Sequence, residues 1–108
     1  MQDNVTKVLK AIADPKRREI FHALIIASSA LSISQISGQF AISRQGVTKH
    51  IKTLQEAGLV EITASGRERF CSADAKPLKQ ITEWVSFYEQ FWDSAINNLG
   101  DFLDSKES

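Results

Sequence analysis

The sequence predicts a mainly α-helical chain that carries one β-hairpin and ends in a long C-terminal helix. Four stretches before the hairpin repeat apolar residues at the spacing of an amphipathic helix, and a longer repeat fills residues 78–102. Between them, an alternating stretch with a glycine turn is typical of a hairpin. The 108 residues fit one domain spanning 1–108, and an apolar content of 43% allows a core.

Two helices are predicted near the N-terminus, at about 4–13 and 15–27. Asp14 and Pro15 separate them, because Asp is a preferred helix cap and Pro fits the first helical position. We expect His22 to lie at the edge of the core. The residues expected to face the core follow helical spacing: Val5, Val8, Leu9, Ile12, Ile20, Phe21, Leu24 and Ile25.

A helix-turn-helix is predicted next. The polar run "SSALSIS" is short enough to be a loop, and Ser32 with Gln35 matches a capping box that opens a third helix. Ser43 caps a fourth helix over about 43–57, and Gly58 ends it. The buried stripe expected on the fourth helix is Val47, Ile51 and Leu54.

The hairpin occupies about 59–73, and its strands meet at a turn that contains Gly66. Arg67 and Arg69 lie near the tip, and Cys71 on the returning strand is expected to face the core as a small apolar residue. A last helix is predicted over about 75–103. Helices and hairpin in this order make a winged helix-turn-helix, with the hairpin as the wing and the last helix available for dimerisation.

The fourth helix carries long polar side chains opposite its buried stripe. Gln45, Lys49 and Lys52 lie on that side at about 100° per residue, and Thr48 lies at its margin. In a helix-turn-helix the second helix enters the DNA major groove with its N-terminal end first. Gln can pair there with adenine, and Arg or Lys with guanine. A solvated helix face, with solubilising arginines in the hairpin, is the alternative to DNA contact.

Charge is unevenly distributed along the chain. The 13 basic and 13 acidic residues cancel, so net charge predicts no partner. Residues 44–69 hold five basic and three acidic side chains, a balance of +2, whereas residues 82–108 hold six acidic and one basic, a balance of −5. The predicted reading helix and wing are therefore locally basic, whereas the C-terminal segment is acidic.

Three stretches resemble the ArsR/SmtB repressors: "ADPKRREIFHAL", "SISQISGQFAISRQGVTKHIKTLQEAGLV" and "EITASGRERF". The resemblance runs from about Val8 to Leu103. Members of that family are dimeric cytoplasmic repressors that bind imperfect inverted repeats in promoters, and metal-free relatives often repress their own operons. The resemblance thus implies a cytoplasmic homodimer that binds double-stranded DNA sequence-specifically.

The expected DNA-binding residues combine this resemblance with the exposed helix face. The full set is Ser43, Arg44, Gln45, Thr48, Lys49, His50, Lys52, Arg67 and Arg69. His50 lies beside the buried stripe, so we expect it half-buried with a backbone or phosphate partner. Ala41 stands where the family often has Gly, which is tolerable if its φ stays negative. Gly46 costs about 1 kcal/mol relative to Ala inside a helix, and we interpret it either as close approach to DNA or as drift.

No metal, cofactor or catalytic site is predicted. Metal-sensing relatives use a Cys pair on the third helix or Asp, His and Glu on the last, but here the third helix has no thiol and the last has no His. The chain resembles the metal-independent branch. No nucleophile–base set or carboxylate pair indicates an enzyme.

The longest apolar run, 20–31, is too short to span a membrane. The lone Cys71 suits a reducing compartment, and a redox role for it is left open.

Two apolar stripes run along the last helix, whereas a helix packed only on its own domain needs one. The first is the expected dimer interface: Leu78, Ile81, Val85, Tyr88, Trp92, Ala95, Leu99 and Phe102. The second is Trp84, Phe87 and Phe91. A wide core face is one alternative. Another is a protein-interaction module whose aromatic helix binds a different protein, but the basic wing and the donor face favour DNA.

Overall fold

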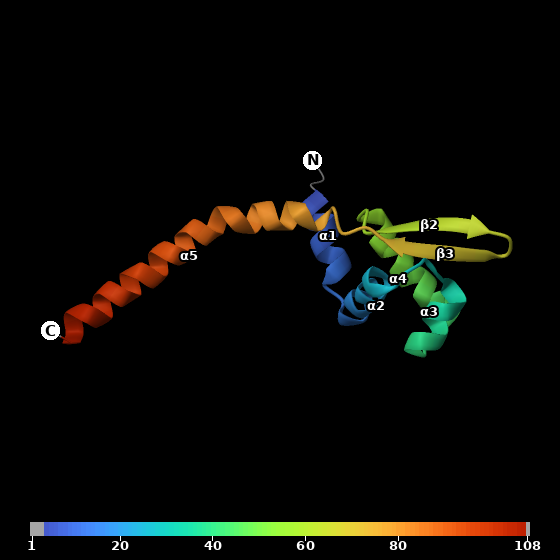
Figure 1. Cartoon of the computed structure of the whole chain (residues 1–108), viewed down its shortest axis with the longest axis horizontal. Helices are drawn as coiled ribbons and strands as arrows, with labels where there is room; N and C mark the ends of the chain where they lie inside the picture. Colours follow the sequence, from blue (N-terminus) through green and yellow to red (C-terminus); the bar gives the residue numbers. More distant parts are fainter. Residues whose placement is uncertain (1–3, 108) are drawn as a thin grey trace.

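The computed structural model describes the backbone of residues 4–107 and the side chains of residues 4–92. Four helices and a small sheet form the body of the molecule, and a long helix projects from it on the side away from the wing (Figure 1). The elements in chain order are α1 (Asn4–Ile12), α2 (Pro15–Ile26), β1 (Leu31–Ser32), α3 (Ile33–Phe40), α4 (Arg44–Glu56), β2 (Val60–Ser65), β3 (Glu68–Ala73) and α5 (Leu78–Glu107).

The predicted winged helix-turn-helix is confirmed, with one strand that the sequence did not indicate. Leu31 and Ser32, expected in a loop, form β1 and pair antiparallel with Cys71 and Phe70 of β3. The sheet order is β1-β3-β2, so β3 is the central strand. A strand of two residues is too short to show alternation, and it forms because β3 has a free edge for it to pair with.

The core lies where the helices meet the sheet. The predicted stripe of α4 is buried, as are Val8, Ile20, Phe21 and Leu24 of the first two helices. The prediction for Leu9 and Ile25 was wrong, because both side chains are exposed. Ile25 instead lines an apolar groove with Ile12, Phe21 and Leu78. Helical spacing placed these residues on an apolar side of the helix but could not tell a core from an uncovered groove.

Two arginines of α2 join it to α1. Arg17 donates from Nε to the carbonyl of Ala11 at 2.6 Å and from Nη2 to that of Lys10 at 3.2 Å. Arg18 donates from Nη1 to the carbonyl of Ile12 at 2.6 Å. Basic residues in a first turn oppose their own helix dipole. Here they also satisfy the free carbonyls at the C-terminus of α1, where positive charge is favourable.

The helix caps agree with the sequence, but the turn between α3 and α4 does not. Ser32 and Gln35 form the predicted reciprocal capping box, and the Ser43 hydroxyl accepts from the Gly46 N–H at 3.1 Å. Ala41 adopts φ 54° and ψ 40°, so the condition of a negative φ is not met. The Ser37 carbonyl accepts from the Ile42 N–H, and the Ser37 hydroxyl donates to the Ile42 carbonyl. These two bonds hold the turn that contains the left-handed Ala41.

Gly46 is tightly packed within the protein, which does not agree with drift, while its close approach to DNA stays a prediction. A β-carbon at this position would lie 2.8 Å from Ile42 Cγ2 and 3.2 Å from the Ser43 hydroxyl oxygen. The first distance is well inside normal van der Waals contact. The glycine therefore makes room for Ile42 and for the cap of α4 within the protein itself.

The C-terminal helix begins later and ends later than predicted. Residues 75–77 form a turn, in which the Leu78 N–H donates to the Ala75 carbonyl at 3.0 Å. The Asp74 carboxylate accepts from the Lys76 N–H at 2.9 Å, which makes Asp74 the cap of this turn. The backbone then stays helical through Glu107, beyond the expected end at 103. The molecule consequently measures 72 × 33 × 23 Å.

Two glycine variants separate packing from helix propensity. Gly46→Ala should lower the free energy of unfolding by about 1–3 kcal/mol, because the new methyl group overpacks against Ile42. Gly38→Ala is the matched control: nothing lies within 4 Å of the added β-carbon, so the better helix former should raise stability by about 1 kcal/mol. Urea unfolding at one protein concentration measures both. Equal stabilisation by the two variants would contradict the packing role of Gly46.

Candidate nucleic-acid interface

Burial on one side of α4 leaves its polar side outside. Val47, Ile51 and Leu54 are buried in the core. The polar residues expected to contact DNA at the solvent side of this helix are exposed: Ser43, Arg44, Gln45, Lys49 and Lys52. The side chains of the N-terminal half are short or planar enough to meet base edges, whereas the lysines further along are flexible charges.

The fold brings the wing beside the N-terminal half of α4. Arg44 and Thr48 of the helix, together with Arg67 and Arg69 of the hairpin, surround one concavity, with Ile33 as its apolar member. Gly66 forms the hairpin turn with φ 62°, a conformation that glycine adopts without strain. Three cationic side chains from segments more than twenty residues apart thus share one site, which favours a polyanion as the ligand.

Two hydroxyl groups of the expected set already have partners inside the protein. The Thr48 hydroxyl donates to the Arg44 carbonyl at 2.8 Å. It can therefore offer an acceptor or its methyl group to a ligand while that bond persists. The Ser43 hydroxyl accepts the capping bond from Gly46, so its first role is to begin the helix.

His50 is half-buried as expected. The partner of its Nδ1 is an arginine side chain and not a backbone group, while a phosphate contact stays a prediction. Its Nδ1 lies 3.4 Å from Nη1 of Arg17. A guanidinium only donates, so Nδ1 acts as the acceptor and Nε2 carries the proton. Arg17 thereby connects the C-terminus of α1 with the middle of α4. The N–H of Arg17 also donates to the Asp14 carboxylate at 3.0 Å, and this hydrogen bond lowers the pKa of Asp14.

Glu68 also belongs to this surface, although the sequence indicates only an acidic charge at its position. Its Oε1 lies 3.9 Å from Nη2 of Arg44 and accepts a hydrogen bond from the Ser34 hydroxyl at 3.4 Å. The carboxylate thus joins α3, α4 and the wing. Its position between Arg67 and Arg69 indicated from the sequence that it lies at the wing. Its contacts with Arg44 and Ser34 depend on the tertiary fold.

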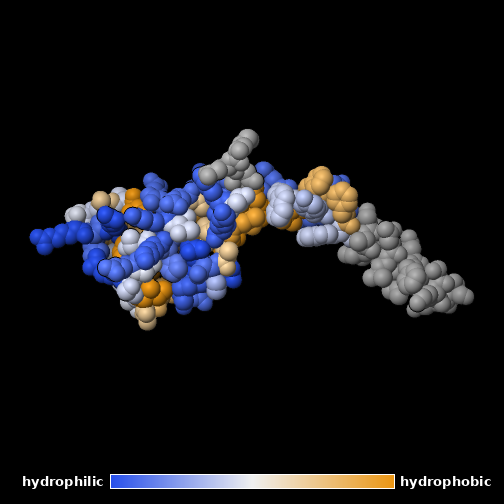
Figure 2. Space-filling model, turned by 180° about the vertical axis from the view of Figure 1, so that it is seen from behind, coloured by the Kyte–Doolittle hydropathy of each residue, from blue (hydrophilic) through white to orange (hydrophobic). Residues whose placement is uncertain are grey.

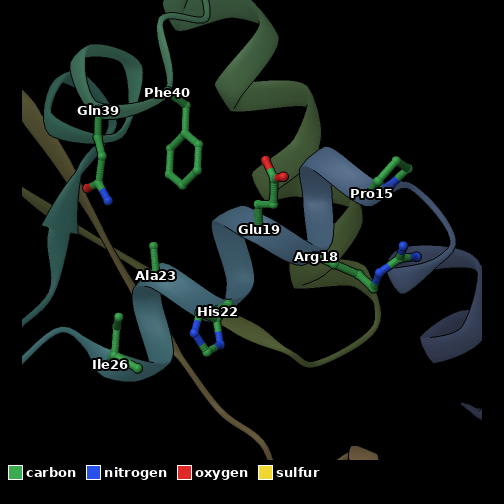
Figure 3. Close-up of a pocket in the computed structure, with 8 residues that line it drawn as sticks. All are labelled: Pro15, Arg18, Glu19, His22, Ala23, Ile26, Gln39 and Phe40. Carbon is green, nitrogen blue, oxygen red and sulfur yellow. The ribbon is translucent and has the colours of Figure 1, made fainter.

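A separate groove lies between α2 and α3. His22, expected at the core edge, is exposed and lines this groove with Arg18, Ala23 and Phe40. The Phe40 ring points toward α2 across the opening (Figure 3). The prediction for His22 was wrong because the third helix leaves this side of α2 partly uncovered.

The described residues hold no group of three or more His, Cys, Asp or Glu side chains placed to bind a metal ion. Cys71 is buried as expected, and burial raises the pKa of its thiol. In the part of the chain that the structure describes, no helix combines the length and apolar character needed to cross a membrane.

The long helix α5 exposes its aromatic residues. The exposed fractions of Trp84, Phe87, Tyr88, Phe91 and Trp92 range from 42% to 57%. Leu78 and Ile81 of the expected interface instead pack partly against their own core, because the first turns of α5 lie on the body. Ala95, Leu99 and Phe102 lie outside the residues whose side chains are described. Figure 2 shows hydrophobic side chains gathered on α5 beside a largely hydrophilic body.

Comparison with known proteins assigns this architecture to a family. A family model described as a helix-turn-helix domain matches residues 12–63. The HTH-type transcriptional regulator YuzN of Bacillus subtilis is 31% identical over 91 residues, which cover 79% of this chain and 99% of YuzN. The crystal structure of an ArsR-like transcriptional regulator from Rhodococcus sp. RHA1 is 28% identical, with a TM-score of 0.76 over 94% of this chain and 92% of that one. The chain belongs to the ArsR family of winged helix-turn-helix transcriptional regulators.

Two further relatives of this ArsR-family regulator have more specific descriptions. The transcriptional repressor SdpR of Bacillus subtilis is 25% identical over 81 residues, covering 75% of this chain and 88% of SdpR. The winged helix-turn-helix DNA-binding domain of Mb0332 from Mycobacterium bovis, described as homodimeric, shares the fold with a TM-score of 0.63 at 20% identity, over 82% of this chain and 80% of that one. The ArsR-family regulator therefore has a repressor among its relatives and a homodimer among its structural neighbours.

Arg17 should stabilise the regulator more than its neighbours in the first turn of α2 do. Arg17→Met removes the bonds to the Ala11 and Lys10 carbonyls and to His50, so stability should fall by about 1–3 kcal/mol. Lys16→Met is the control, because among the described residues the Lys16 side chain makes an exposed ion pair with Glu19 at 3.0 Å and a contact with the Phe40 ring at 5.9 Å. Its loss should stay below about 1 kcal/mol. Urea unfolding measures the free energy of unfolding of both variants. Similar losses would contradict the role of Arg17 in joining α1, α2 and α4.

Proposed function

We propose that the chain is a cytoplasmic, metal-independent repressor that binds an inverted-repeat operator as a homodimer, with residues 1–108 as one domain. The observation that supports DNA binding best is the concavity shared by α4 and the wing, with Arg44, Arg67 and Arg69 around it. An amphipathic helix whose outer side is rich in donors fits the major groove. The wing arginines fit the neighbouring phosphates or a narrow minor groove.

The nine predicted residues would make different kinds of contact with DNA, according to the chemistry of their side chains. Gln45 and Arg44 have planar donors that suit base edges, and Thr48 offers an acceptor and a methyl group. Lys49, Lys52 and the wing arginines suit phosphates, with Ser43 and His50 acting mainly through the helix itself. Repression follows if such a complex covers a promoter, and the relationship to SdpR supports that reading.

Homodimerisation would cover the aromatic surface of α5. An aromatic side chain buries about 150–250 Å², so five that are half-exposed leave on the order of 500 Å² uncovered. That area is a large share of the roughly 800 Å² that each partner buries in a stable interface. The apolar groove at Ile12, Phe21, Ile25 and Leu78 adjoins the start of α5 and extends the surface. A two-fold axis would then place two α4 helices on the two halves of an inverted repeat.

Substitutions on α4 and the wing test the DNA-binding proposal. Gln45→Ala should cost about 1–3 kcal/mol on the operator and little on scrambled DNA, because it removes a base contact. Lys52→Ala should weaken both complexes similarly and make the salt dependence shallower by about one unit per lost phosphate contact. Arg67→Ala should resemble Lys52→Ala, unless the wing enters a narrow minor groove, where its effect would vary with flanking sequence.

The measurement is affinity at several salt concentrations on an operator selected from random duplexes and on a scrambled duplex. Equal losses of affinity on both duplexes for Gln45→Ala and Lys52→Ala would contradict the assignment of Gln45 to a base and Lys52 to a phosphate. No loss for either would mean that α4 does not read DNA. The exposed aromatic residues of α5 would then favour the alternative function, a module that binds another protein.

A charge in the aromatic surface tests the dimer. Trp92→Glu should give monomers or aggregates, because dimerisation would bury an unpaired carboxylate. Gln90→Glu is the matched control: it adds the same charge two residues away, on the polar side of the same helix, and should leave the dimer intact. Light scattering over a range of protein concentrations measures the mass of each. A Trp92→Glu protein that stays dimeric would place the interface elsewhere.

A further inference from the structure

A carboxylate in the middle of a basic surface requires an explanation. Glu68 is the only acidic residue between positions 62 and 73, and it lies between the two wing arginines. A negative charge at this place repels DNA phosphates and lowers affinity for any duplex. Its contacts are nevertheless specific, since Oε1 faces Arg44 at 3.9 Å and accepts from Ser34 at 3.4 Å. No described donor reaches Oε2, which is buried.

We propose that Glu68 is a positioning residue that orients Arg44 for one base pair of the operator. The proposal rests on the proposed function, in which α4 reads the major groove. Ser34 of α3 anchors the carboxylate, and the carboxylate holds one end of the Arg44 guanidinium. The side chain of Arg44 is still 63% exposed, so its other N–H groups remain available to a ligand.

The geometry of arginine supports this role. A guanidinium carries five donors in a planar fork, and the fork matches the O6 and N7 acceptors of guanine. A free Arg44 must lose rotamer freedom on binding. An Arg44 already held by Glu68 loses less of that freedom, and it can keep the ion pair while it contacts a base. On a random duplex the same restraint keeps Arg44 from adapting to the nearest phosphate.

A simpler role makes a different prediction. If Glu68 only repelled phosphates, its removal would raise affinity for every duplex and leave each base preference unchanged. If it positions Arg44, its removal must weaken the preference at the base pair that Arg44 contacts. The readout is therefore the base preference at each position of the half-site. A change in overall charge or in fold stability would not alter the preference at one base pair alone.

The experiment uses the full chain. An operator is selected from random duplexes, and affinity is then measured for every single base-pair substitution in one half-site. Arg44→Ala should reduce discrimination at one base pair by about 5- to 150-fold. Glu68→Gln should reduce it at the same base pair by about two- to five-fold for each half-site, while affinity for scrambled DNA rises. Glu61→Gln, an equal charge change on the exposed side of β2, should leave all base preferences unchanged.

Two further variants test the coupling itself. The double variant Arg44→Ala with Glu68→Gln should discriminate at that base pair no less than Arg44→Ala alone. Ser34→Ala keeps every charge, removes the anchor of Glu68 and should weaken the same preference by a smaller factor. Thermal melting verifies that each variant is folded, and Ser34→Ala alone decides the matter if Glu68→Gln does not fold.

The outcomes are distinct. Selection that enriches no duplex would overturn DNA reading and the positioning role together. Enrichment with unchanged base preferences in Glu68→Gln and Ser34→Ala would overturn the positioning role and leave the proposed function standing. A preference lost at a base pair other than the one lost in Arg44→Ala would also overturn it, because Glu68 would then act independently of Arg44.

Discussion

Burial of the stripe formed by Val47, Ile51 and Leu54 determines which side of α4 remains outside, and the rest of the surface depends on it. All three side chains are at most 1% exposed. Burying such a residue contributes about 1.5–3 kcal/mol, more than an exposed polar contact. Hydrophobic burial therefore orients the helix, and the periodicity of the helix places Gln45 and Lys49 on the opposite side.

Contacts at the middle and at the start of α4 then hold that orientation. Arg17 contacts the carbonyl end of α1 and the imidazole of His50, so three helices meet at one guanidinium. Gly46 keeps the start of α4 clear of the Ile42 side chain, and the left-handed Ala41 brings the chain into the Ser43 cap. Small changes at these positions would move the exposed polar side of α4 without altering a residue that is proposed to contact DNA.

The separation of charge along the chain has a structural meaning. Arg44, Arg67 and Arg69 surround one concavity at α4 and the wing. The acidic residues of the C-terminal segment lie on α5, which projects from the other side of the body (Figure 1). Electrostatic interactions between exposed charges are screened beyond about 8 Å at physiological salt. Because α5 and the wing extend from opposite sides of the body (Figure 1), the charge near the wing differs from the net charge of zero. Glu68 is different because it lies within the basic surface and contacts Arg44 directly.

The sequence by itself determined the elements of this protein and the polarity of α4, because helical periodicity, caps and turn glycines are local signals. The capping box at Ser32 and the buried stripe of α4 were predicted from these signals and found in the structure. Only the tertiary structure decided the pairing of β1 with β3, the position of Arg17 between α1 and His50, and the contact of Glu68 with Arg44 and Ser34. Apart from the bonds of Arg17 to α1, these contacts join residues 24 or more positions apart, and no short-range pattern records such distances. The left-handed Ala41 was missed for the related reason that residues 37 and 42 hold the turn, and a propensity for residue 41 alone does not include them.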